Sequence, residues 1–164
     1  MGPWVKSLVL SAAAAVSFGV AEAAEAGKMR VGAWYGEPSF SSAGEFRHCS
    51  MIARYANGVS LYFALGEDDA LIIGLLEAKL GIPSGEQSLV VLEIDGEWRR
   101  SVTAEGSGTL DRIVLGPAPE IVEALRRGRA LRVVGSAGAV DLTLKDTADA
   151  FAKLRECVGE NRTR

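Results

Sequence analysis

Residues 46–65 read FRHCSMIARYANGVSLYFAL, and this stretch decides the fold of the chain. Asn57 and Gly58 lie between two runs of alternating apolar residues, which is the pattern of a β-hairpin. A two-residue Asn-Gly loop would place Leu61 opposite Arg54 and divide the apolar side chains between the two faces. A three-residue loop with Gly58 in the left-handed conformation keeps them on one face. The apolar pattern therefore predicts the three-residue loop, with its bulge.

The predicted register fixes which side chains of this hairpin enter the core. Its successive cross-strand pairs are all apolar: Tyr55–Val59, Ala53–Leu61, Met51–Phe63 and Cys49–Leu65. Successive strand residues point to opposite faces of a sheet. The register therefore directs Cys49 into the core and His48 to the other face, with Ser50 and Arg54.

The only two cysteines of the chain are Cys49 and Cys157. Residues 147–158 carry apolar side chains at helical spacing, with Asp146 as the predicted cap and Gly159 as the stop. Cys157 lies on the apolar face of this helix, so both cysteines face the core. We therefore predict a structural disulfide between them. The alternative is a free, reactive thiol.

The rest of the chain alternates short apolar runs with turn residues, which is typical of a sheet-rich protein. Residues 29–35 are predicted to open the sheet, and 36–45 to form a polar loop. Residues 70–76 fit a buried strand or a short helix, and we favour the strand. Pro119 begins a helix that runs to Arg127. We expect a mainly β (α+β) fold, either an antiparallel sandwich or a half-open barrel. It would have seven to eight strands and two short helices, the second C-terminal.

The first 26 residues have the pattern of a secretory signal peptide. Lys6 precedes an apolar run over 7–20, and small residues offer cleavage near Ala23 or Ala26. We expect a periplasmic or secreted protein with no transmembrane segment in the mature chain, since the apolar run is short and no second one follows. The domain organisation predicted is a signal peptide (1–26), a single β-rich domain (27–159) and a disordered tail (160–164).

Composition and motifs exclude several classes of function. The formal net charge is −3, and no concentrated basic surface is evident, so we expect no nucleic-acid partner. Neither a nucleophile elbow nor a phosphate-binding loop occurs. With His48 the single histidine, we expect no metal or other cofactor. The leading hypothesis is a non-enzymatic domain that binds a protein or another envelope component. The alternatives are a small-ligand carrier within the sheet interior and a thiol-dependent enzyme using Cys49 and His48.

Two groups of residues are candidates for contact with a partner. The first is a basic cluster that could dock an acidic partner, although a helix dipole alone would account for two of its members. It consists of Arg126, Arg127, Arg129 and Arg132. The second is a group of aromatic residues that could line a binding surface or pack in the core. It consists of Trp34, Tyr35 and Phe40. An acidic run, Glu67 to Asp69, is interpreted as a solvated turn.

Several short segments resemble small exported proteins of Gram-negative bacteria. These segments are Gly32-Ala33-Trp34, Phe46-Arg47-His48-Cys49, Tyr55-Ala56-Asn57-Gly58, Arg127-Gly128, Asp141-Leu142-Thr143-Leu144 and Leu154-Arg155-Glu156-Cys157-Val158. More loosely, the chain is similar to the invasion-associated locus B family. That resemblance implies a periplasmic, β-rich protein without an established catalytic site.

Overall fold

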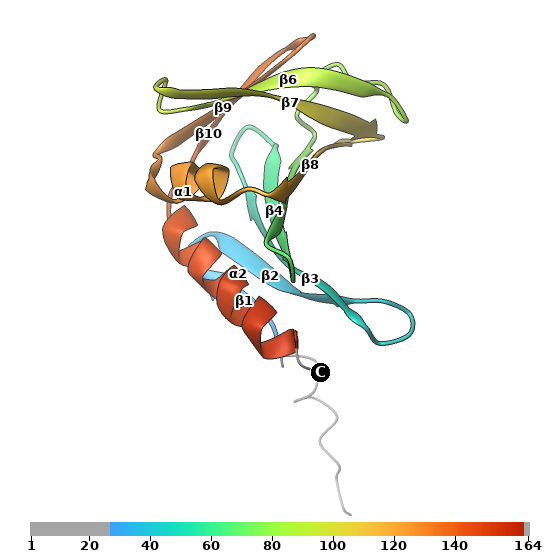
Figure 1. Cartoon of the computed structure of the whole chain (residues 1–164). Helices are drawn as coiled ribbons and strands as arrows, with labels where there is room; N and C mark the ends of the chain where they lie inside the picture. Colours follow the sequence, from blue (N-terminus) through green and yellow to red (C-terminus); the bar gives the residue numbers. More distant parts are fainter. Residues whose placement is uncertain (1–26, 163–164) are drawn as a thin grey trace, which may run out of the picture.

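The computed structural model describes residues 27–162 and consists of one antiparallel sheet with two helices (Figure 1). The strands are β1 (Met29–Val31), β2 (Trp34–Phe40), β3 (Phe46–Arg54), β4 (Ser60–Gly66), β5 (Ala70–Leu76), β6 (Gln87–Ile94), β7 (Trp98–Ser107), β8 (Leu110–Pro117), β9 (Ala130–Gly135) and β10 (Gly138–Thr143). The helices are α1 (Pro119–Arg127) and α2 (Thr147–Asn161). The mainly β class and the C-terminal position of the second helix are confirmed. The ten strands of the described residues exceed the predicted seven to eight. The predicted signal peptide lies outside the described residues.

The sheet is a single bent layer whose ends do not meet. Its strand order is β1-β2-β3-β4-β5-β8-β7-β6-β9-β10, so β1 and β10 each have one neighbour. Figure 1 shows β6, β7, β9 and β10 in the upper part of the molecule and β1 to β3 in the lower part. The junction between β7 and β8 is short, because only residues 105–107 pair with residues 110–112. Beyond that junction the two strands separate.

One strand was missed because its sequence lacks an apolar alternation. The segment 36–45 was predicted to be a loop, but β2 runs to Phe40 and pairs with both β1 and β3. A turn at Gly32, with φ +53°, separates β1 from β2. A Cβ atom on Gly36 would lie 1.8 Å from the carbonyl oxygen of Ser50. Glycine is therefore required here because the backbones of β2 and β3 approach closely.

The predicted hairpin has the predicted register. Cys49 pairs with Leu65, Met51 with Phe63 and Ala53 with Leu61. The loop is closed by a hydrogen bond from the amide of Tyr55 to the carbonyl of Val59 at 2.9 Å. Gly58 has φ +86°, the left-handed conformation that the three-residue loop requires.

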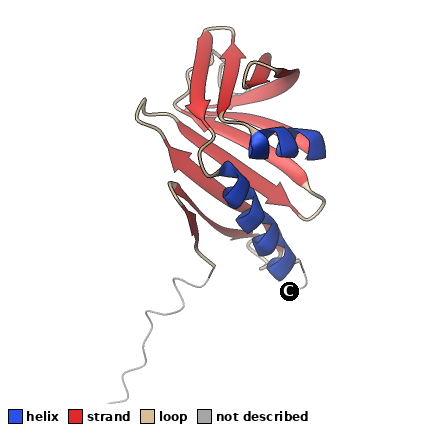
Figure 2. Ribbon diagram, turned by 90° about the vertical axis from the view of Figure 1, so that its left-hand side faces the viewer, coloured by secondary structure: helices blue, strands red, loops and turns tan. Residues whose placement is uncertain are grey.

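One part of the core lies between this hairpin and α2, which contacts β1 to β4 and also α1; the rest extends under β5 to β10 and α1. The longer helix in Figure 2 is α2, lying across the sheet. Phe63 stands between two other aromatic rings, with centroids 5.1 Å from Trp34 and 4.9 Å from Phe151. All three rings are almost fully buried. Large aromatic side chains of this kind supply much of the stabilisation that burial provides.

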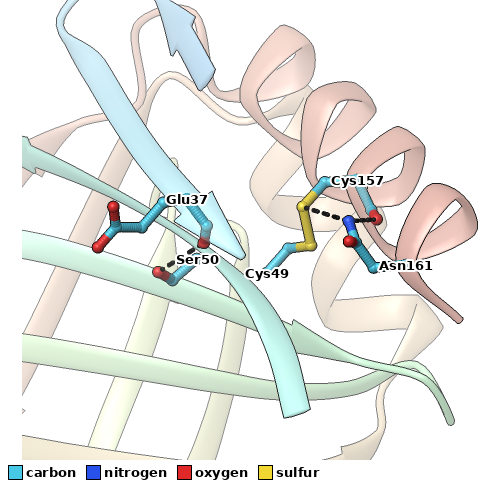
Figure 3. The surroundings of a disulfide bond; sticks show 5 residues. All are labelled: Glu37, Cys49, Ser50, Cys157 and Asn161. Carbon is cyan, nitrogen blue, oxygen red and sulfur yellow. Dashed lines mark hydrogen bonds between the residues drawn. A yellow bond between two sulfur atoms is a disulfide. The ribbon is translucent and has the colours of Figure 1, made fainter. Parts of the chain in front are cut away.

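The predicted disulfide is present between Cys49 on β3 and Cys157 on α2 (Figure 3). The cap of α2 differs from expectation: Asp146 has φ +59° and makes no capping hydrogen bond through its side chain. The helix also ends later than predicted. It continues through Gly159 to Asn161, whose side-chain amide donates to the carbonyl of Cys157 at 2.8 Å. Glu160 and Asn161 are therefore helical, where a disordered tail was predicted.

Candidate functional site

A groove lies on the face of the sheet opposite α2. Its position follows from strand alternation: Cys49 points to α2, and the next residue, Ser50, points to the other face. Figure 3 shows these two side chains on opposite sides of β3. The groove has a volume of about 760 Å³. Its lining residues are Lys28, Met29, Arg30, Tyr35, Gly36, Glu37, Ser50, Ile52 and Tyr62.

A cross-strand row forms the floor of the groove. The pairing registers place Arg30, Tyr35, Ile52, Tyr62 and Gly74 side by side on β1 to β5. A Cβ atom on Gly74 would lie 3.0 Å from the Tyr62 ring, so this ring covers the glycine. Tyr35 remains half exposed at 50%. The row therefore offers two phenol rings and an isoleucine to a ligand, with a guanidinium at one end.

Polar groups surround these rings. Within residues 27–162, neither Lys28 nor Arg30 has an ion-pair partner, and the same is true of the Glu37 carboxylate. The hydroxyl of Ser50 donates to the backbone carbonyl of Glu37 at 3.4 Å. The groove thus combines aromatic surface with unpaired charges of both signs.

His48 is connected to this site through Tyr62. The His48 Nε2 atom and the Tyr62 hydroxyl oxygen are 3.2 Å apart. Burial lowers the pKa of His48, and the charge of Arg47 lowers it further. Burial raises the pKa of Tyr62, against smaller opposing effects of Ser50 and Arg112. Both side chains are therefore neutral at pH 7, and a neutral imidazole can accept or donate this hydrogen bond.

The geometry separates the two residues of the thiol-enzyme hypothesis. Cys49 is bonded to Cys157, and no free cysteine occurs in the part of the chain that the structure describes. His48 contacts Tyr62 on the other face of the sheet. The disulfide prediction is confirmed. A thiolate activated by His48 would need a reduced, reoriented Cys49.

The aromatic candidates have three different environments. Trp34 is 1% exposed, stacks on Phe63 and donates its indole N–H to the carbonyl of Lys145 at 2.9 Å. Phe40 is 42% exposed and packs edge-on against Phe46. Tyr35 alone of the three lines the groove. The structure therefore assigns Trp34 to the core.

The basic cluster spans the end of α1 and the start of β9 and is largely paired with carboxylates. Arg126 and Arg127 both contact Glu123, which precedes them by one helical turn. Arg132 contacts Asp141 at 2.8 Å. The side chain of Arg129 has no ion-pair partner within residues 27–162, but its backbone amide donates to Asp95. These arginines therefore do not form a concentrated positive surface.

Sequence reasoning missed most of the groove. Arg30, Ile52 and Tyr62 were not singled out, although a signal existed for two of them. Ile52 and Tyr62 occupy outward positions of the predicted hairpin, where apolar or aromatic side chains need an explanation. Their pairing across β3 and β4 follows from the predicted register.

Comparison with known proteins supports the fold. The crystal structure of invasion-associated protein B from Bartonella henselae is similar to this chain, with a TM-score of 0.56 and 20% sequence identity. The match covers 81% of this chain and 97% of that chain. No family model matches the sequence, and no curated protein matches it. The similarity to an invasion-associated protein B is thus established for the fold.

Among residues 27–162, no helix is both long and apolar enough to cross a membrane. Over the same residues, no group of three or more histidine, cysteine, aspartate or glutamate side chains could hold a metal ion.

Proposed function

We propose that this chain is an exported, non-enzymatic domain that binds a protein partner of the cell envelope or the extracellular space. The observation that carries the proposal is the groove opposite α2. Tyrosine and arginine are the residue types enriched at the energetically important centres of protein interfaces. Tyr35, Tyr62 and Arg30 gather there on rigid strands.

Rigidity favours this use of the groove. The disulfide and the aromatic core support β3 from behind, and β3 supplies Ser50 and Ile52 to the floor. Side chains held on paired strands lose little conformational freedom when a partner binds, so less binding energy is spent on ordering them. The unpaired charges of Lys28, Arg30 and Glu37 would set the orientation of the partner.

Export is part of the proposal and has two supports. One is the signal-peptide pattern of residues 1–26, with cleavage near Ala23 or Ala26. The other is the disulfide, because such bonds persist in oxidising compartments. Together they favour a periplasmic or secreted location.

Site-specific photo-crosslinking in the source cells tests the proposal. In the test protein, a photoreactive residue replaces Tyr35 in the groove. In the matched control it replaces Leu89, an apolar side chain of β6 that is 72% exposed. We expect a crosslinked product of defined mass from position 35 and none from position 89. Adding Arg30→Ala to the protein with the photoreactive residue at position 35 should reduce the yield of the crosslinked product. Equal labelling from both positions, or none from position 35, would contradict the proposal.

A second candidate function is the binding of a small ligand in the same groove. Its volume of about 760 Å³ falls within the range of small-molecule sites, roughly 300–1,000 Å³. Native mass spectrometry of the exported protein distinguishes this alternative. A bound mass that is released by Tyr62→Ala would favour a ligand over a protein partner.

A further inference from the structure

The free edge of β10 leaves backbone hydrogen-bonding groups without partners. The amide of Leu144 donates to the carbonyl of Arg129 at 2.8 Å, so the backbone N–H of Leu144 points toward the β9 side. Alternation then turns the N–H and C=O groups of Ala139, Asp141 and Thr143 away from β9. The Tyr55 hydroxyl confirms this orientation, since it donates to the carbonyl of Thr143 at 2.7 Å. No other hydrogen bond among residues 27–162 reaches these outward groups.

A row of alternating charges crosses four strands and ends at this edge. The registers align Arg99 on β7, Glu93 on β6, Arg132 on β9 and Asp141 on β10. Each neighbouring pair is an ion pair, at 3.3, 4.0 and 2.8 Å in that order. The row therefore runs positive, negative, positive, negative. A residue on a strand added beyond β10 would continue the row opposite Asp141, and the Asp141 carboxylate favours a cation there.

A shallow depression beside this edge has the same charge preference. It has a volume of about 540 Å³ and is lined by Glu93, Asp95, Gly96, Glu97, Arg129, Ala130, Arg132 and Asp141. Four carboxylates thus face two guanidiniums. Glu97 has no ion-pair partner within residues 27–162. The surface around Arg129 and Arg132, two of the four arginines of the basic cluster, is therefore net negative.

We propose that β10 binds an extended segment of a protein partner as an added strand, with an arginine or lysine of that segment opposite Asp141. Main-chain hydrogen bonds to Ala139, to Asp141 and to the amide of Thr143 supply the attachment, and the charge row supplies the register. This site is distinct from the groove opposite α2 and does not depend on it.

The other candidate occupants and edges fit less well. A second copy pairing β10 antiparallel with β10 would bring its own Asp141 close to the first, which like charge disfavours. The free stretch of β7 presents Arg99 at the opposite end of the row, so a basic segment is repelled there. The β1 edge is three residues long. Of these three edges, that of β10 is thus the one that suits a basic strand.

Two peptides and two variants of position 139 test the proposal on the exported, oxidised protein. The probes are acetyl-TSVRVST-amide and acetyl-TSVEVST-amide, titrated while amide NMR shifts are followed. We expect the arginine peptide to shift the amides of Ala139, Asp141 and Thr143, and to bind about fivefold or more tightly than the glutamate peptide. Ala139→Pro removes one outward N–H while leaving the bonds to β9, and should abolish binding. Ala139→Ser is the matched control and should retain it.

Charge reversal provides a test that does not depend on the proline variant. Asp141→Lys should reverse the preference, so that the glutamate peptide binds better. Equal binding of both peptides, shifts at β7 or in the groove, or no binding by the arginine peptide would overturn the proposal. Sedimentation velocity tests for a second copy as the occupant. If the unmodified protein dimerises and Ala139→Pro abolishes the dimer, β10 binds a second copy of this chain and the proposal is overturned.

Discussion

Two antiparallel hairpins of this protein both bury one face in the core but differ in their neighbours. The inner hairpin, β3–β4, has neighbours on both sides, is crosslinked to α2 and directs apolar pairs into the core. The edge hairpin, β9–β10, has β6 on one side only and aligns Arg132 with Asp141 on its outer surface. Because both of its strands are paired on each side, the first offers a partner only the side chains of the groove. The second also retains free backbone groups along β10, together with its charges.

The largest expected effect comes from removing the crosslink of the inner hairpin. Replacing both cysteines (Cys49→Ser with Cys157→Ser) should lower the free energy of unfolding by roughly 3 to 5 kcal/mol, because the bond closes a loop of 108 residues. Urea unfolding monitored by circular dichroism measures the change. Reduction of the unmodified protein should give the same loss. A change under about 1 kcal/mol would mean that burial alone holds α2 in place.

A matched pair of leucines compares the two hairpins directly. Leu61 on β4 and Leu142 on β10 are both buried. Leu61→Ala should cost about 3 to 4 kcal/mol and Leu142→Ala about 2 to 3 kcal/mol, since an edge can collapse around a cavity more easily than a central strand. Urea unfolding of both variants gives the difference. Equal losses would show that the edge is packed as rigidly as the interior.

Tyr55 links the two hairpins, and its hydroxyl can be removed alone. Tyr55→Phe deletes the hydrogen bond to Thr143 and should cost about 0.5 to 1.5 kcal/mol. Burial raises the pKa of Tyr55 to about 12, so the folded state favours the neutral phenol. Stability should therefore fall as pH rises from about 10 to about 12, because the unfolded chain ionises first. Tyr55→Phe should flatten this alkaline slope, and an unchanged slope would contradict the assignment.

The charge row should contribute least to stability. Arg132→Gln removes two ion pairs that are largely exposed, and should change the free energy of unfolding by less than about 1 kcal/mol. Thermal unfolding at low and high salt measures this. A loss well above that value would make the row a structural feature of the edge hairpin rather than a recognition feature.

His48 gives the inner hairpin an acid sensitivity. Its pKa is lowered by burial and by Arg47, so the folded state resists protonation. Stability should be greatest above the unfolded pKa of about 6.5 and decrease as pH falls through that value toward the lower folded pKa. His48 is the only histidine, so His48→Gln should remove this part of the pH profile. Urea unfolding between pH 5 and pH 8 tests the slope.

The inner hairpin could be predicted from sequence because its information is local. Apolar alternation on both sides of Gly58 allows one register that buries every pair, and that register also directs Cys49 toward the last helix. The strand β2 lacked such a signal. Gly36 and Pro38 suggested a loop, whereas the close approach of β3 is what requires the glycine. Local patterns therefore identified strands with a buried face and missed a half-exposed one.

The charge row could not be predicted, because it depends on strand order. Glu93 and Arg132 are neighbours only because β6 lies beside β9, and these strands are not consecutive in the chain. The pairing of Arg126 and Arg127 with Glu123 could have been predicted, since the two arginines follow Glu123 by three and four positions on one helix. The arginines alone do not determine the charge of this surface, because carboxylates lie beside them.

The position of the disulfide also determines when it can form. In a chain that emerges in order at roughly 5 to 20 residues per second, the second cysteine follows the first by roughly 5 to 20 s. Throughout that interval Cys49 is a single thiol, available to an oxidase or to another chain. Once Cys157 arrives, the two cysteines permit only one intramolecular pairing, so oxidation needs no isomerase to reshuffle it. The disulfide therefore cannot form before the last helix has emerged.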